Sequence, residues 1–171
     1  DQEYNASFVN FEGRCYYAFQ EATHCAPLAY NPVAPLILCF DFNVEPGVCA
    51  IVQEQTLPGQ FELDARRLPM LDRPVTGAGV IGEVHIPRNS NTEAVCNKVL
   101  ADWGTHRGPV RCYGDATGGA RGTAKVQGSD WDIIRQMLRP VFGDRFSVRV
   151  PAANPAERAR VNAMNTRMKA G

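Results

Sequence analysis

The sequence lacks the features of a membrane protein, a repeat protein or a strongly charged protein. No apolar run approaches the roughly 20 residues that a membrane-spanning helix needs, and the polar start Asp1-Gln2-Glu3 is unlike a signal peptide. No internal repeat is visible. Basic and acidic residues are equal in number, at 18 each, so net charge by itself gives no signal about a nucleic-acid partner. We therefore expect a protein that does not bind a membrane.

Metal-binding cysteine motifs are also missing. The six cysteines include no Cys-x-x-Cys pair and no spacing typical of zinc ligands. Cys39, Cys49 and Cys112 lie in apolar stretches, where buried free thiols are expected. Because free thiols persist in reducing compartments, these residues favour a cytoplasmic location.

What is present indicates one folded domain with additional segments. The chain has 171 residues, of which 44% are hydrophobic and 21% charged, as in ordinary globular proteins. Residues 1–114 carry 8 basic and 13 acidic side chains, whereas residues 115–171 carry 10 basic and 5 acidic ones. A basic C-terminal third is typical of a phosphate-binding surface, and a chance asymmetry of a solvated surface explains it equally well.

Apolar patterning predicts the order of the secondary-structure elements. Strands are expected at residues 36–43, 48–53, 80–86, 109–113 and 145–150. The first two are joined by the turn Glu45-Pro46-Gly47 and should form a hairpin. Residues 57–77 are rich in proline, glycine and charge and are predicted to be a long insertion.

Three helices are expected between and after the later strands. The first follows an N-cap at Ser90 or Asn91, with Glu93 completing a capping box, and ends at Gly104. The second begins at Ser129 and should be stopped by Pro140. The third begins at Asn154-Pro155, with Val161, Met164 and Met168 as its apolar stripe.

This order predicts an α/β fold with a mixed central sheet of about five strands and helices on both faces. Three consecutive strands followed by alternating helices and strands occur in the ribonuclease H-like fold and in other mixed folds. We expect residues 1–35 to be a connector and residues 36–171 to be the folded domain.

Two aspartates are the candidate chemical groups. Asp41 follows five apolar residues of the first predicted strand, and Asp115 follows the fourth. If these strands are parallel neighbours, both carboxylates project from one edge of the sheet. Two hard oxygen ligands at adjacent strand ends suit Mg²⁺ or Mn²⁺. For either residue alone, a role in a turn or helix cap is the competing interpretation.

The glycine-rich loop after Asp115 does not match an ATP-binding loop. Gly114 and Gly119 have Walker A spacing, but Ala120 and Arg121 stand where that motif needs Lys and Ser or Thr. The loop offers four side chains that could bind a DNA backbone: Thr117, Arg121, Thr123 and Lys125. A polar surface loop without a ligand is the alternative.

Several motifs of this sequence resemble motifs of the large terminase subunit of tailed phages, and they occur in the same order along the chain. Asp41-Phe42-Asn43-Val44-Glu45-Pro46 and Tyr113-Gly114-Asp115-Ala116-Thr117-Gly118 resemble the acidic motifs of its nuclease domain. Residues 2–8 and 13–19 look like the segment that leads from the ATPase domain into the nuclease. Residues 154–165 resemble the penultimate helix. The resemblance spans nearly the whole chain.

The resemblance implies a ribonuclease H-like endonuclease that cuts concatemeric double-stranded DNA during genome packaging. Two Mg²⁺ or Mn²⁺ ions would lie between the carboxylates, roughly 3.5–4 Å apart. Asp41 would contact both ions, and Asp115 would contact one. The implied partners are an ATPase domain, a small terminase subunit and a portal, in the cytoplasm of the host cell. The isolated domain is expected to be a monomer.

One element of the family pattern is missing. The family supplies a further acidic residue from a C-terminal helix, and residues 154–171 contain only Glu157, which the helix dipole explains without a metal. The chain is therefore expected to be short at its C-terminus, to lack the ATPase part, and to bind metal weakly or not at all by itself.

Two other functions remain open. Another ribonuclease H-like nuclease, such as a junction resolvase or a hybrid-specific ribonuclease, would use the same clustered carboxylates on a different substrate. A non-catalytic module that binds DNA and seats a motor on a portal would need neither aspartate.

Overall fold

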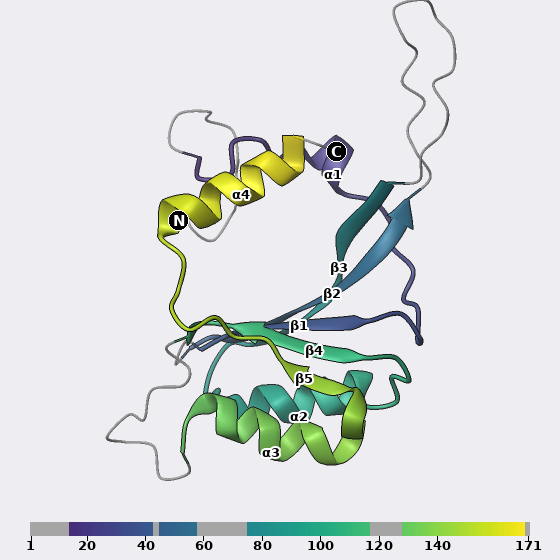
Figure 1. Ribbon diagram of the computed structural model, residues 1–171, viewed down its shortest axis with the longest axis vertical. Helices are drawn as coiled ribbons and strands as arrows, with labels where there is room; N and C mark the ends of the chain where they lie inside the picture. Colours follow the sequence, from purple (N-terminus) through teal and green to yellow (C-terminus); the bar gives the residue numbers. More distant parts are fainter. Residues whose placement is uncertain (1–13, 43–44, 58–74, 117–127, 170–171) are drawn as a thin grey trace, which may run out of the picture. The chain divides into compact units, whose positions relative to one another are not determined.

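The computed structural model describes residues 14–42, 45–57, 75–116 and 128–169 (Figure 1). The chain divides into two compact units. The sheet unit comprises Leu28–Asn154, and the terminal unit comprises Asp1–Pro27 together with Pro155–Gly171. The predicted boundary between a connector (1–35) and a folded domain (36–171) stays a prediction.

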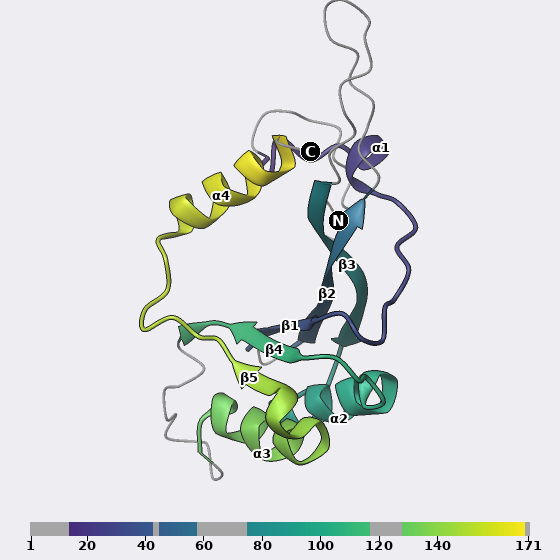
Figure 2. The same ribbon diagram turned by 45° about the vertical axis from the view of Figure 1, so that its right-hand side comes forward.

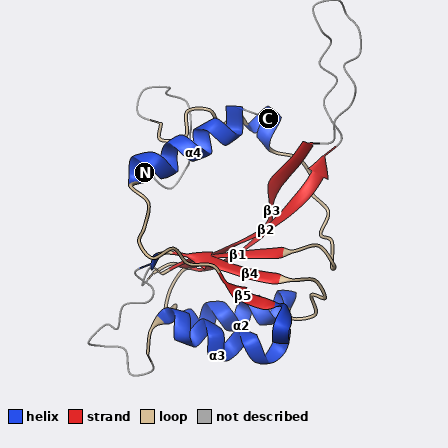
Figure 3. Ribbon diagram, in the orientation of Figure 1, coloured by secondary structure: helices blue, strands red, loops and turns tan. Residues whose placement is uncertain are grey.

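A mixed five-stranded sheet forms the centre of the sheet unit (Figure 3). Its strands are β1 (Leu36–Asp41), β2 (Gly47–Leu57), β3 (Val75–Ile86), β4 (Val110–Gly114) and β5 (Phe146–Val148). They lie in the order β3-β2-β1-β4-β5. β1 is antiparallel to β2 and parallel to β4, and β4 is parallel to β5. The predicted α/β class with a mixed sheet, the order of the elements along the chain and the hairpin are confirmed.

β2 and β3 are longer than the sequence pattern predicted. β1 pairs with β2 only as far as Gln53, whereas β2 and β3 remain paired to Leu57 and Val75. The outer part of this hairpin is therefore a two-stranded ribbon. The predicted insertion at 57–77 was too long at both ends, and residues 58–74 lie outside the described part of the chain.

Helix α2 (Thr92–Trp103) begins and ends close to its predicted limits. Asn91 is the N-cap, and its side-chain oxygen accepts a hydrogen bond of 2.7 Å from the Ala94 N–H. The alternative N-cap at Ser90, with a capping box to Glu93, was therefore wrong. The cap at Asn91 satisfies the N–H of Ala94, one residue beyond the Glu93 N–H that a cap at Ser90 would have bonded. Gly104 is the C-cap, as predicted.

Helix α3 (Asp130–Phe142) passes through the proline that was expected to stop it. Ser129 caps the helix and forms a reciprocal capping box with Asp132. Pro140 lacks the N–H that would bond one turn back, but Phe142 lies two residues further on and is only 1% exposed. Burial of Phe142 holds the last turn in place, and the helix ends at Gly143, whose φ is +58°.

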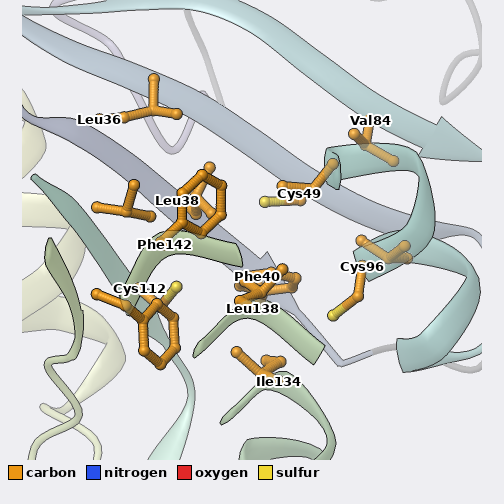
Figure 4. Close-up of a cluster of buried hydrophobic side chains, with 14 of the residues drawn as sticks. Leu36, Leu38, Phe40, Cys49, Val84, Cys96, Cys112, Ile134, Leu138 and Phe142 are labelled. Carbon is orange, nitrogen blue, oxygen red and sulfur yellow. The ribbon is translucent and has the colours of Figure 1, made fainter. Parts of the chain in front are cut away.

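Both helices cover the same face of the sheet, as Figures 1 and 2 show. The core lies between them and alternate residues of the strands, including Leu38, Phe40 and Cys112 of the sheet and Ile134 and Leu138 of α3 (Figure 4). We call this side the helix face and the opposite side the second face. Helices on both faces were predicted, and among the described residues of the sheet unit this is not seen. No helix in the described ranges is long and apolar enough to cross a membrane.

The segment before β1 is hydrogen-bonded to a buried polar side chain of the sheet. Gln53 is fully buried; its amide nitrogen donates to the carbonyls of Asn31 (2.8 Å) and Ala34 (3.3 Å). The Asn31 N–H donates to the Gln53 side-chain oxygen at 2.9 Å. Residues 28–35, predicted to belong to the connector, are therefore hydrogen-bonded to β2 within the sheet unit.

The terminal unit contains α1 (Glu21–His24) and α4 (Glu157–Lys169). Among the residues of this unit that the structure describes, Asn165 is the most buried, at 1% exposed. The Asn165 amide accepts from the Ala18 N–H (3.0 Å) and donates to the Cys15 carbonyl (2.9 Å). Of the predicted apolar stripe, Met164 is 51% exposed. Val161 and Met168 are half-buried, so the predicted stripe is wrong only at Met164, because the polar Asn165 is buried against the N-terminal segment instead.

All six cysteines are free. Cys49 and Cys112 are buried as predicted, and Cys39 is only half-buried. Cys96 of α2 is also buried, although no apolar run marks it in the sequence. Burial raises the pKa of the Cys96 thiol to about 12, so this group stays protonated at neutral pH and behaves as an apolar core residue.

Candidate metal centre

The two predicted aspartates lie at the ends of neighbouring parallel strands. In the pairing of β1 with β4, Phe40 lies beside Gly114. Asp41 and Asp115 are the next residue of each chain segment. Paired residues of adjacent strands have Cα atoms about 5 Å apart. The parallel, adjacent arrangement that the sequence analysis required for a shared site is therefore present.

Strand alternation assigns the two carboxylates to the second face. In β1, Leu38 and Phe40 are buried under the helices, whereas Asp41 is exposed. In β4, Cys112 is buried under the helices, and Asp115 has the opposite parity. Successive side chains of a strand point to opposite faces. Asp41 and Asp115 thus share one face and one edge of the sheet.

The backbone around Asp115 is held from two directions. The indole N–H of Trp131 donates a 3.0 Å hydrogen bond to the Asp115 carbonyl. The Ala116 N–H donates to the side chain of Asn154 at 2.8 Å. These contacts hold the backbone at the end of β4 and thereby fix the position from which the Asp115 side chain extends.

Gly114 allows this close packing. A Cβ atom at this position would lie 2.7 Å from the Phe40 carbonyl oxygen and 3.0 Å from the Trp131 ring. Both distances are too short for a real side chain, so any larger residue would push Trp131 away from the strand. The glycine of the Tyr113-Gly114-Asp115 motif thus has a packing role beside the site.

Asp115 has an unsatisfied oxygen. Its Oδ1 atom is buried and has no hydrogen-bond partner among the described residues. A buried carboxylate oxygen without a donor or a cation is energetically unfavourable. A divalent cation between Asp41 and Asp115 would satisfy this oxygen, and carboxylates are the ligands that Mg²⁺ and Mn²⁺ prefer. The residues present therefore fit such an ion.

A complete ligand set is not found in the described part of the chain. No group of three or more His, Cys, Asp or Glu residues suited to a metal ion occurs there. The predicted DNA-contact residues Thr117, Arg121, Thr123 and Lys125 all lie outside the described residues. Two carboxylates alone leave most positions around a divalent ion to water or to further ligands.

The other acidic residues have structural explanations or lie away from this edge. Glu45 is exposed and accepts a 2.7 Å hydrogen bond from the N–H of Asn89, whose φ is +51°. Asp130, only 7% exposed, accepts from the Thr92 hydroxyl at 2.6 Å and joins the starts of the two helices. Glu54 and Glu83 are exposed on β2 and β3.

The histidines are not ligands in this arrangement. His106 is buried at the start of the segment that leads into β4, and its Nδ1 atom hydrogen-bonds with the Tyr30 hydroxyl at 2.8 Å. Burial lowers the pKa of His106, and the Arg145 guanidinium lowers it further. In the terminal unit, both ring nitrogens of His24 are hydrogen-bonded, to Gln20 and to the Met168 carbonyl.

The residues that surround the carboxylates carry no signal of their own in the motifs around Asp41 and Asp115. Trp131 and Asn154 hold the backbone of Asp115, and both come from other parts of the chain. Arg111 and Tyr113 precede Asp115 on its own strand. Strand alternation alone could have identified the latter two, since they have the same parity as Asp115.

Among known proteins, no family model matches this sequence, and a search of curated proteins finds no significant match. The resemblance to phage terminases therefore depends on the motif residues themselves.

Proposed function

We propose that this chain is the nuclease part of a tailed-phage large terminase subunit, with a ribonuclease H-like fold. It would cut concatemeric double-stranded DNA in the cytoplasm of the host cell during packaging, next to an ATPase domain, a small terminase subunit and a portal. One observation carries the proposal. Asp41 ends β1, Asp115 directly follows the neighbouring parallel strand β4 with the parity of the second face, and Asp115 Oδ1 is buried without a partner in the described ranges.

The chemistry assigned to this site is metal-assisted phosphodiester hydrolysis. Asp41 and Asp115 would hold Mg²⁺ or Mn²⁺ through their carboxylate oxygens. A bound divalent ion supplies Lewis-acid activation of water and neutralises charge on the phosphate. Trp131 and Asn154 keep the end of β4 fixed, so that the Asp115 carboxylate does not need to be ordered when the ion binds.

Plasmid cleavage tests the proposal. Nicking of supercoiled DNA in Mn²⁺ and in Mg²⁺ is measured for this chain and for the longest natural protein that contains it. Asp41→Asn and Asp115→Asn should each reduce cleavage at least about 100-fold, because changes behind a metal ligand already cost 10–100-fold. Asp144→Asn is the matched control, since Asp144 is an exposed acid between α3 and β5 that belongs to neither the carboxylate edge nor the second face. Equal cleavage by Asp41→Asn and the parent protein would contradict the proposal.

One observation favours a second candidate. Only two carboxylates come together in the described part of the chain, which is fewer than the three acidic residues that the family resemblance implies. A module that binds DNA and seats a motor without cutting would show no Mn²⁺-dependent nicking even in the longest natural protein. If cleavage occurs, preference for branched DNA or an RNA–DNA hybrid over plain duplex would instead identify another ribonuclease H-like nuclease.

A further inference from the structure

Two arginines and a tyrosine lie side by side next to the candidate metal centre. Arg111 and Tyr113 belong to β4. The Arg149 N–H donates a 2.8 Å hydrogen bond to the Cys112 carbonyl. This bond continues the parallel pairing of Cys112 with Val148 by one residue, and it sets Arg149 beside Tyr113.

These three residues share the face of the carboxylates. Cys112 is buried on the helix face, so Arg111 and Tyr113 have the parity of the second face. Tyr113 precedes Asp115 by two residues, which corresponds to about 7 Å along a strand. We call Arg111, Tyr113 and Arg149 the basic strip.

The basic strip is available for binding. Tyr113 is 37% exposed, Arg149 is exposed and Arg111 is half-buried. Neither Arg111 nor Arg149 forms an ion pair with any described residue. In this respect they differ from Arg145, whose guanidinium donates to the carbonyls of His106 and Gly108.

The other half of the second face has the opposite charge. Glu83 lies opposite Ala50 in the pairing of β2 with β3. Glu54 has the parity of Ala50 on β2, and both glutamates are exposed. Across the sheet, the acidic half on β2 and β3 is thus separated from the basic strip by β1, which ends in Asp41.

We propose that the basic strip binds a nucleic-acid strand and delivers its backbone to the edge that carries Asp41 and Asp115. Arg111 and Arg149 contact phosphates, and Tyr113 packs against a sugar or an unstacked base. The strand crosses β4 and β5 and avoids β2 and β3, where Glu54 and Glu83 repel it. The inference deepens the proposed nuclease function, on which it rests, by naming the residues that position the substrate.

Charge and ring chemistry support this path. Guanidinium groups bind phosphates through several N–H donors and release counterions when they do so. An aromatic ring beside a positively charged track is the arrangement that holds single strands by stacking. Two cationic side chains also offset part of the repulsion between a DNA backbone and two carboxylates that lie close together.

Equilibrium binding of a fluorescein-labelled oligonucleotide tests the basic strip without cleavage. Binding is measured in EDTA over a range of salt concentrations, with single-stranded and duplex probes, for the parent chain and for Arg149→Gln and Tyr113→Leu. Arg139→Gln is the matched control, because Arg139 is an exposed arginine of α3, on the other side of the sheet.

Arg149→Gln should weaken binding of both probes roughly five- to tenfold at about 0.1 M salt and lower the salt slope by about one. Tyr113→Leu should weaken binding of the single strand by at least about fivefold and leave the salt slope unchanged. Arg139→Gln should bind like the parent. If Arg149→Gln and Arg139→Gln bind equally well, with equal salt slopes, the basic strip is not a nucleic-acid site.

The outcome is separable from that of the plasmid experiment. Weaker binding by the strip variants together with no cleavage by any protein would support the strip and reject the nuclease. Unchanged binding together with cleavage that Asp41→Asn abolishes would reject the strip and support the nuclease. Near-parent thermal unfolding of Arg149→Gln and Tyr113→Leu excludes misfolding as the cause of a binding defect.

Discussion

The two faces of the sheet are built by the same strands and have opposite character. On the helix face, Leu38 and Phe40 of β1 pack beneath α2 and α3 and are almost completely buried. Their direct neighbours in β1 lie on the second face, where Cys39 is half-buried and Asp41 is exposed. A shift of one residue along a strand therefore moves a side chain from the core to the candidate site. Every second side chain of a strand stabilises the core on the helix face. The side chains between them lie on the second face, where charged groups are tolerated.

Cysteine reactivity should show the largest contrast between the faces. Cys112 lies on the helix face, where burial strongly raises the pKa of its thiol. Cys39 lies on the second face and is half-buried, and burial raises the pKa of its thiol as well. Under native conditions, alkylation of Cys112 should require global unfolding, which typically costs at least about 5 kcal/mol. Cys39 should react at least about tenfold faster, by local opening.

Mass spectrometry of timed alkylation measures both rates in one sample. Cys15 and Cys25 are exposed and serve as internal standards for unhindered reaction. Equal protection of Cys39 and Cys112 would mean that the second face of β1 is as inaccessible as the core.

Truncation of adjacent apolar residues should show the same contrast as a stability difference. Leu38 is fully buried, whereas its neighbour Ile37 is only partly buried. Leu38→Ala should lower the free energy of unfolding by about 2–5 kcal/mol through lost burial and a residual cavity. Ile37→Ala should cost no more than about half as much. Urea unfolding of both variants checks this, and equal losses would show that the second face contributes to the core.

Gln53 is the polar exception on the helix-face side of β2. Gln53→Ala removes three hydrogen bonds to Asn31 and Ala34 and leaves backbone groups unsatisfied. The free energy of unfolding, measured with urea, should fall by roughly 2–3 kcal/mol. The matched control is Gln55→Ala, since Gln55 makes a single, exposed hydrogen bond to the Ala29 carbonyl. A loss as small as that of the control would mean that the segment before β1 is held by other contacts.

His106 should produce the smallest effect, and only at acid pH. Burial lowers its pKa from the ordinary value of 6.5. Between that value and the lower pKa of the folded state, the unfolded chain binds more protons than the folded chain. Stability contributed by neutral His106 is therefore complete above pH 6.5 and is lost as the pH falls, by at most about 1.4 kcal/mol per pH unit.

The pH dependence is measured as the urea midpoint from neutral to acid pH. His106→Gln should flatten it, whereas His85→Gln should not, because His85 is exposed on β3. If both variants retain the slope of the parent, the acid sensitivity comes from groups other than His106.

Prediction from sequence succeeded where a local pattern carried the information. The apolar run ending in Asp41 identified β1, and the cap at Ser129 identified the start of α3. It failed where a distant contact overrides the local signal. Pro140 continues a helix because Phe142 is buried, and Asn165, not Met164, is buried because its amide bonds to the Cys15 and Ala18 backbone.

The sequence by itself determined the elements, their order and the two aspartates, because apolar periodicity and strand-end polarity are encoded within a few neighbouring residues. Only the tertiary structure decided which residues meet. The parallel pairing of β1 with β4 brings Asp115 beside Asp41, and the β4–β5 pairing sets Arg149 beside Tyr113. These partners are separated by many residues along the chain. Their proximity depends on strand pairing and register, which the burial of the whole helix face selects.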